Sequence, residues 1–265
     1  MTAAKARKYG AILGVSLRSG LMYRGNVLGG LLFYALFIFV FFSLWGTIYR
    51  AGGVPGYSLP QMIWYVCVTE LIVFGCRSGV FGQISESIKS GAVAYELNRP
   101  YHYVFYRFFS ALGGIVFSFL FYAASALALG HLFVGPLPNF RLWMLPFVLV
   151  SIGLGAVIQF FSYLCLGLSA FFIEENRAFM FIYSKLVLML GTFIPVEFFP
   201  GWLQTVVRYL PFSYITWAPA RMAVDFSWGH VASALPLQLA WAAVMIALSL
   251  LLYRKGVRRV NVQGG

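Results

Sequence analysis

Residues 27–49 read VLGGLLFYALFIFVFFSLWGTIY, a run that contains no charged side chain. A helix needs about 20 mainly apolar residues to cross the hydrocarbon core of a bilayer, so this run is long enough to span a membrane. Five more apolar runs follow, at 61–84, 105–132, 142–173, 178–199 and 232–253. The sequence therefore predicts an all-α, polytopic membrane protein with six transmembrane helices.

The composition of the 265-residue chain indicates the same class. It is 61% hydrophobic and only 10% charged, and its mean hydropathy is +0.84. Soluble domains are typically about 45–50% apolar and about 25% charged. So few charges leave too little polar surface for a soluble globule, which argues against an ordinary soluble enzyme and against a disordered chain. We expect a single transmembrane domain over residues 1–265, surrounded by membrane lipid.

The basic residues give the expected orientation. If the N-terminus is cytoplasmic, thirteen Lys and Arg residues fall on cytoplasmic segments, and four fall on external ones: Arg50, Arg141, Arg208 and Arg221. Such a bias is the positive-inside signal, and six spans return the C-terminus to the cytoplasm. The net charge of +12 thus comes from residues between apolar runs. For that reason we expect no nucleic-acid partner.

The first 25 residues are predicted to form an amphipathic helix in the membrane interface, because apolar and basic residues separate at helical spacing. One face carries Tyr9, Leu13, Leu17 and Leu21, and the other carries Arg7 and Arg18. The alternative is a basic, partly ordered tail.

Residues 195–231 are predicted to be broken into short helices on the extracytoplasmic side, possible re-entrant segments among them. Pro195 and Pro200 each remove a backbone donor, so a straight helix cannot continue through them. Three tryptophans, Trp202, Trp217 and Trp228, are typical of a membrane–water interface.

The chain lacks the short motifs of an enzyme. It has no GxxxxGK[ST] phosphate loop, no HExxH and no GxSxG. Its three histidines are far apart, and its three cysteines lie in apolar runs without metal-ligand spacing. We therefore expect no cofactor, metal or catalytic group in this chain.

Two segments between apolar runs are candidates for contact with a soluble partner. Residues 82–103, GQISESIKSGAVAYELNRPYHY, join the second and third runs. Glu86 and Lys89 are spaced to pair along one helical turn, and Gly91 is suited to end the helix. Residues 174–177, EENR, join the fourth and fifth runs. The alternatives are an ordinary connecting loop and a solvated turn.

These segments resemble a known family. SGAVAYELNRP at 90–100 looks like the "sG.i...L.rP" element of ABC-2 type transporter permeases. FIEENRAF at 172–179 and GTFIPVEFFPGWLQTVVRYLPFSYITWAPARM at 191–222 resemble the "G..iPl..fP.wl..i...lPf.y....P" signature of the same family. The resemblance covers nearly the whole chain. One departure is Thr192-Phe193, where many relatives carry a second small residue, so the packing of that bend is in question.

The resemblance implies the permease subunit of an ATP-driven ABC exporter in the bacterial cytoplasmic (inner) membrane, with both termini cytoplasmic. A separate ABC ATPase, in two copies, would bind ATP and Mg, and a second permease, either a different homologous chain or a second copy, would complete the pore. The substrate would be an amphiphile, a drug or a lipid-like molecule. A coupling helix would lie within residues 84–103.

The family pattern also implies roles for individual residues. The ATPase contacts would be Glu86, Lys89, Gly91, Glu96, Arg99 and Pro100, with a second contact at Glu174 and Glu175. The extracytoplasmic gate would contain Pro195, Glu197, Pro200 and Pro211.

Three charges fall within expected spans: Glu70, Arg77 and Lys185. A charge at the bilayer centre costs about 2.5–3.5 kcal/mol on insertion scales, so such residues should face protein or a polar cavity. Arg77 and Lys185 are near enough to span ends to reach the interface. Glu70 would either pair with a cation of the partner permease or line the translocation path with Arg77.

Glu70 also supports an alternative function, a proton-coupled secondary transporter that uses its carboxylate. The absence of inverted repeats in the sequence argues against this alternative. An intramembrane enzyme is disfavoured because no nucleophile and base come together in the sequence.

Overall fold

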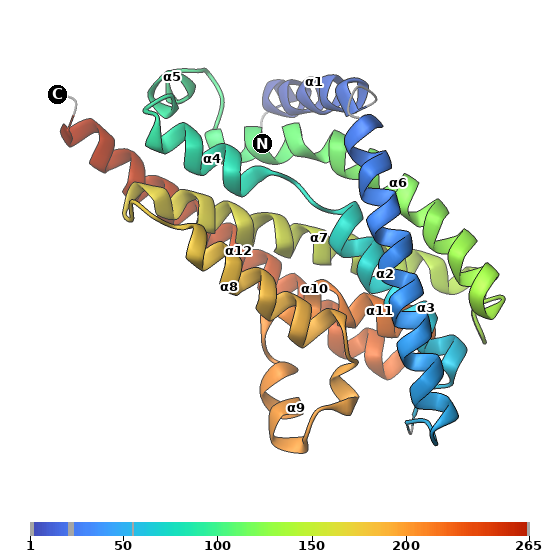
Figure 1. Cartoon of the computed structure of the whole chain (residues 1–265). Coiled ribbons are helices and arrows are strands. Elements are labelled where there is room, and N and C mark those ends of the chain that lie inside the picture. The colour runs from blue at the N-terminus through green and yellow to red at the C-terminus, as the bar shows by residue number, and fades with distance from the viewer. Residues whose placement is uncertain (1–2, 21–23, 55, 264–265) are drawn as a thin grey trace.

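The computed structural model describes residues 3–20, 24–54 and 56–263, which form helices joined by turns and short loops, with no strand among them (Figure 1). The ends of the predicted interfacial helix, 1–2 and 21–23, lie outside the described residues. The first half contains α1 (Ala3–Gly20), α2 (Arg24–Arg50), α3 (Leu59–Gly75), α4 (Val80–Lys89), α5 (Val93–Leu97) and α6 (Tyr103–Val134). The second half contains η2 (Leu142–Met144), α7 (Leu145–Leu168), η3 (Ser169–Phe171), α8 (Arg177–Val187), η4 (Leu188–Thr192), η5 (Val196–Phe198), α9 (Gly201–Val207), α10 (Pro211–Ile215), α11 (Trp217–Val224) and α12 (Trp228–Gln263).

Five helical stretches are long and apolar enough to cross a membrane: Gly29–Arg50, Leu59–Lys89, Tyr103–Val134, Leu142–Phe171 and Trp228–Arg259. The chain is therefore a multi-pass membrane protein. The expected span at 178–199 is not among the five, because α8 has only 11 residues and passes into the π-helical turn η4. The six-span count stays a prediction.

The second apolar run, expected at 61–84, falls within the spanning stretch Leu59–Lys89, but it is divided between two helices, α3 and α4. The last turn of α3 closes when the Cys76 N–H donates to the Ile72 carbonyl, and α4 begins only at Val80. The four residues between them include the polar Arg77 and Ser78, and Arg77 is exposed. Mean hydropathy over the run does not register such a break, since apolar residues continue on both sides. Arg77 thus lies at the break between α3 and α4, inside the Leu59–Lys89 stretch.

Helix α1 packs along α6. The Tyr9 ring stacks on Phe109 with 5.2 Å between ring centroids, and the Ser16 hydroxyl accepts the Gly113 N–H at 3.1 Å. A Cβ at Gly113 would lie 2.2 Å from the Ser16 carbonyl carbon, so this close approach requires glycine. Whether α1 also rests in the membrane interface stays a prediction.

The helices run between two ends of the molecule (Figure 1). At one end, which we call the α5 end, α1 and α5 lie together, and α12 finishes on the same side. At the other end, the α9 end, lies α9, and the turn from α2 to α3 is on this side too. The pair α7 and α12 and the pair α3 and α6 make the most extensive helix contacts of the spanning segments. This arrangement separates the two groups of candidate residues described next.

Candidate functional site

Two loops far apart in the sequence meet at the α5 end. The Lys89 Nζ atom, at the end of α4, lies 3.6 Å from the Glu175 carboxylate, which precedes α8. Lys89 therefore pairs with Glu175. The helical spacing had predicted Glu86 as its partner instead. The backbone N–H of Arg177 donates to Glu175 at 2.8 Å. That N–H, with Lys89 beside it, holds the pKa of Glu175 below its ordinary value.

Asn176, which is 0% exposed, joins these loops from within. Its Oδ1 accepts the Ser85 hydroxyl of α4 at 2.9 Å. Its Nδ2 donates to the Leu166 carbonyl of α7 at 2.9 Å and to the Ser169 hydroxyl at 3.4 Å. We call Ser85, Lys89, Leu166, Glu175 and Asn176 the coupling junction. Asn176 was not among the residues predicted from the sequence, although an amide between two apolar runs is a signal that the sequence shows.

Most of the ATPase-contact residues implied by the family resemblance are exposed on or near the turn from α4 to α5. Gly91 has φ +76, a left-handed conformation, and it lies between α4 and α5, so the expected coupling segment at 84–103 contains two short helices. Arg99 donates to the Tyr101 hydroxyl at 3.1 Å, and Lys8 of α1 donates to the Pro100 carbonyl at 2.5 Å. The residues at the surface here are Glu86, Lys89, Gly91, Arg99, Pro100, Glu174 and Glu175.

Glu96 differs from these exposed residues because it is partly buried and its carboxylate is paired within the chain. Its carboxylate lies 2.6 Å from the Arg107 guanidinium of α6 and accepts the Ser87 hydroxyl at 3.3 Å. These contacts tie α5 to α4 and α6. The structure therefore gives Glu96 a positioning role in this turn.

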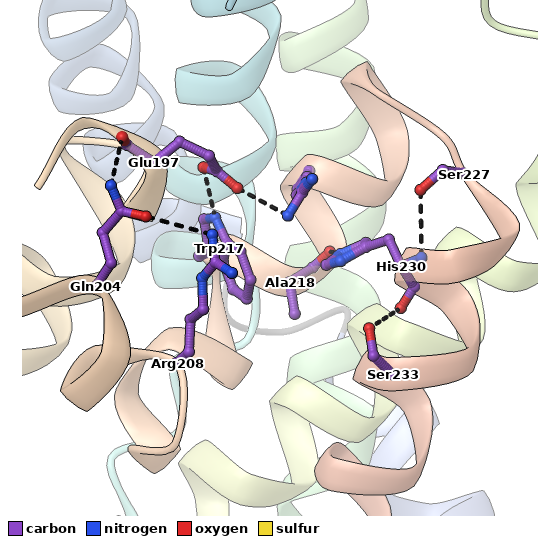
Figure 2. A network of polar contacts seen from close by, with 9 residues as sticks. Glu197, Gln204, Arg208, Trp217, Ala218, Ser227, His230 and Ser233 are labelled. Atoms are coloured by element: carbon purple, nitrogen blue, oxygen red, sulfur yellow. Dashed lines mark hydrogen bonds and ion pairs between the residues drawn. The ribbon is translucent and has the colours of Figure 1, made fainter. Parts of the chain in front are cut away.

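At the α9 end, Glu197 is the centre of a polar network (Figure 2). Its carboxylate lies 2.8 Å from the Arg221 guanidinium and accepts the Trp217 indole N–H at 3.1 Å. The Gln204 amide donates to the Glu197 carbonyl at 2.9 Å and accepts from Arg208 at 3.3 Å. The network therefore holds η5, α9 and α11 together.

Each expected gate proline stands at the start of a short helix. Pro195 precedes η5, Pro200 precedes α9, and Pro211 is the first residue of α10. Proline is favoured at such positions because its fixed φ suits a helix start and its missing N–H has no partner to lose. Pro195 and Pro211 are buried, while Pro200 is exposed.

The network of Figure 2 continues from α11 to α12 through His230. The ring Nε2 of His230 lies 3.0 Å from the Ala218 carbonyl. A carbonyl only accepts, so Nε2 carries the proton in this contact. The Ser233 hydroxyl donates to the His230 carbonyl at 3.1 Å, one turn along α12. This histidine is a structural link between the two helices.

Glu70 lies inside the chain, at 1% exposure in α3. Its Oε1 atom has no hydrogen-bond partner in the described part of the chain. The side chain is thus buried within this chain, and the pairing of Glu70 with a cation of a partner permease stays a prediction. No ion pair joins Glu70 to Arg77 among the described residues, and Lys185 is exposed on α8.

The sequence from residue 27 to residue 264 matches the family described as ABC-2 family transporter protein. The chain belongs to the ABC-2 transporter family. No protein of curated function matches it significantly. ABC-2 permeases are membrane transport subunits that associate with an ABC ATPase and are not themselves catalytic. Within the described residues, no group of three or more His, Cys, Asp and Glu side chains is placed to hold a metal ion.

Proposed function

We propose that this ABC-2 permease is the membrane subunit of an exporter, driven by a separate ATPase that docks at the α5 end. The single observation that carries the proposal is the coupling junction. One of its two loops precedes α6 in the chain and the other follows α7. They are nevertheless joined by a buried amide and an ion pair. A partner bound to either loop would therefore move both.

The junction offers a direct route for force into the spanning helices. Helix α4 packs along α7, and Asn176 bonds both α4 and the carbonyl of Leu166 near the end of α7. Displacement of α4 would thus be passed to α7, and from α7 to α12, which packs against it. The exposed carboxylates Glu86 and Glu174 suit a basic groove on the partner.

In this proposal the energy comes from outside the chain. The sequence has no phosphate loop, so the ATPase would bind ATP and Mg, in two copies. A second permease, identical or different, would supply the other half of the pore. The Glu197 network would keep the α9 end closed, and its ion pair with Arg221 would have to separate or shift for substrate to leave.

Co-purification tests docking. We expect the triple variant Glu86→Ala, Arg99→Ala and Glu174→Ala to retain at least tenfold less ATPase than the wild type, because all three side chains are exposed at the docking surface. A matched control removes exposed charges elsewhere: Arg50→Ala, Arg141→Ala and Asp225→Ala. Equal ATPase retention by the docking triple and the wild type would refute the proposal.

The buried carboxylate of Glu70 supports one other function, proton-coupled secondary transport. Reconstitution separates the two. Export that needs the ATPase and ATP is expected for the permease, whereas substrate movement driven by a pH gradient without the ATPase, and lost in Glu70→Gln, would favour the alternative.

A further inference from the structure

A groove of about 1290 Å³ opens between α1, α2 and α6, and the break between α3 and α4 forms its back wall. Ligand pockets are typically about 300–1,000 Å³, so this groove has room for more than a small polar molecule. Neither Glu70 nor the Glu197 network lines it. It is a separate feature from the coupling junction and from the expected gate.

The lining of the groove combines apolar and polar side chains. One part is aromatic and aliphatic, with Phe33 and Phe37 of α2, Phe74 of α3, and Ile115, Phe117 and Tyr122 of α6. The other part is polar and includes Ser16 of α1, Arg77, Ser78, Gln83 and Ser110. Phe33 is 69% exposed. The groove thus offers both polar groups and apolar surface, the two kinds of contact that an amphiphile needs.

Arg77 gives the lining of the groove a net positive charge. Two arginines line the groove, but Arg107 is paired with Glu96 at 2.6 Å. All seven acidic residues of the chain lie in its described part, and none of the ion pairs there includes Arg77. Helix α4 also starts at the groove, and its N-cap residue Gly79 has no side chain to cap the first turn. The positive end of its dipole adds to the charge of Arg77.

We propose that this groove binds an anionic membrane phospholipid, with the phosphate at Arg77 and an acyl chain along the aromatic wall. Guanidinium groups bind phosphate oxygens through two parallel hydrogen bonds. No acidic side chain lines the groove among the described residues to bind the ammonium group of a zwitterionic headgroup, so the net positive charge favours an anionic one. The exposed wall of α2 continues from the groove, since Phe33 and its neighbour Leu32 both face outward. A soluble phosphate would use only the arginine and leave this apolar wall uncovered. The inference goes beyond export, because binding needs no ATPase.

Native mass spectrometry of the chain from nanodiscs tests the site. The nanodiscs hold phosphatidylglycerol and phosphatidylethanolamine in equal amounts. We expect the wild type to retain phosphatidylglycerol in preference, and Arg77→Gln to retain about tenfold less, through loss of a charge-assisted contact. Arg18→Gln is the matched control, because Arg18 is an exposed cation of α1 that does not line the groove. It is expected to behave like the wild type.

A second variant tests the acyl-chain wall without a change of charge. Gly114 lines the groove, and a Cβ there meets nothing within 4 Å, so Gly114→Leu should fold normally and fill the space. We expect it to reduce retention of phosphatidylglycerol at least as much as Arg77→Gln. Full retention in Arg77→Gln, or an equal loss in Arg18→Gln, would overturn the proposal in favour of diffuse surface charge.

Two further outcomes would also overturn it. Complete displacement of the lipid by soluble glycerol 3-phosphate would show that the headgroup alone is held and that the apolar wall plays no part. Loss of the lipid when the permease assembles with a second copy would show that protein covers the groove instead.

Discussion

Asn176→Ala should loosen the coupling junction more than any change to the ion pair beside it. The substitution removes three hydrogen bonds, to Ser85, Leu166 and Ser169. It also leaves a buried hydroxyl and a buried carbonyl to find new partners, if any can reach them. The expected effect is a local opening of α4 from α7 while the spanning helices remain packed.

The magnitudes separate the amide from the ion pair. A typical hydrogen bond contributes about 0.5–1.5 kcal/mol net, and an unsatisfied buried group costs about 1–3 kcal/mol. With two bonds at 2.9 Å and one at 3.4 Å, we expect Asn176→Ala to cost about 2–4 kcal/mol. The Lys89–Glu175 pair has side chains 30% and 65% exposed, and pairs of this kind contribute about 0–1 kcal/mol. Glu175→Gln should therefore change little.

Hydrogen exchange followed by mass spectrometry measures this opening directly. Since about 1.4 kcal/mol is a factor of ten in an equilibrium constant, Asn176→Ala should speed amide exchange over 84–90 and 174–180 by about ten- to a thousandfold. Exchange in the middle of α12 serves as the internal control. Ser85→Ala should give a smaller increase, and the double variant should cost less than the sum of the two.

Two results would refute the reasoning. If Glu175→Gln accelerates exchange as much as Asn176→Ala does, the ion pair and not the amide holds the junction. If Asn176→Ala leaves exchange over 84–90 unchanged, α4 is held by its apolar contacts alone.

Three further predictions follow from other regions. Glu197→Gln should lower the free energy of unfolding by about 1–2 kcal/mol, because it removes the charge that pairs with Arg221; an unchanged melting temperature would contradict this. Glu70→Gln should keep the melting temperature and ATP-driven export near those of the wild type, since it retains the shape of a buried side chain; selective loss of export would instead assign the carboxylate to transport. Single cysteines at Lys255 and Trp202, both exposed, should label from opposite sides of the membrane in a chain without Cys67, Cys76 and Cys165; labelling of both by an impermeant reagent on intact cells would refute the orientation inferred from the basic residues.

The sequence was sufficient to predict the class of protein and the family. The free energy of moving a segment into a bilayer is close to a sum over its own residues, so apolar runs reveal spanning helices without any knowledge of packing. Proline acts in the same local way, because it removes its own N–H. The helix starts after Pro195 and Pro200 and the turn at Gly91 therefore followed from residues close to them in the chain.

Only the tertiary structure decided which polar groups meet. Ser85 and Asn176 are 91 residues apart, and Glu197 reaches Arg221 from a different short helix. Spacing along one helix predicted Glu86 as the ion-pair partner of Lys89, but in the structure Lys89 pairs with Glu175 from a different loop. Whether Glu70 is interior and Arg77 is exposed also depends on how α3 ends and on what packs around it. The partner of a side chain depends on where distant segments of the chain lie in three dimensions. Hydropathy and other properties summed over neighbouring residues do not predict this.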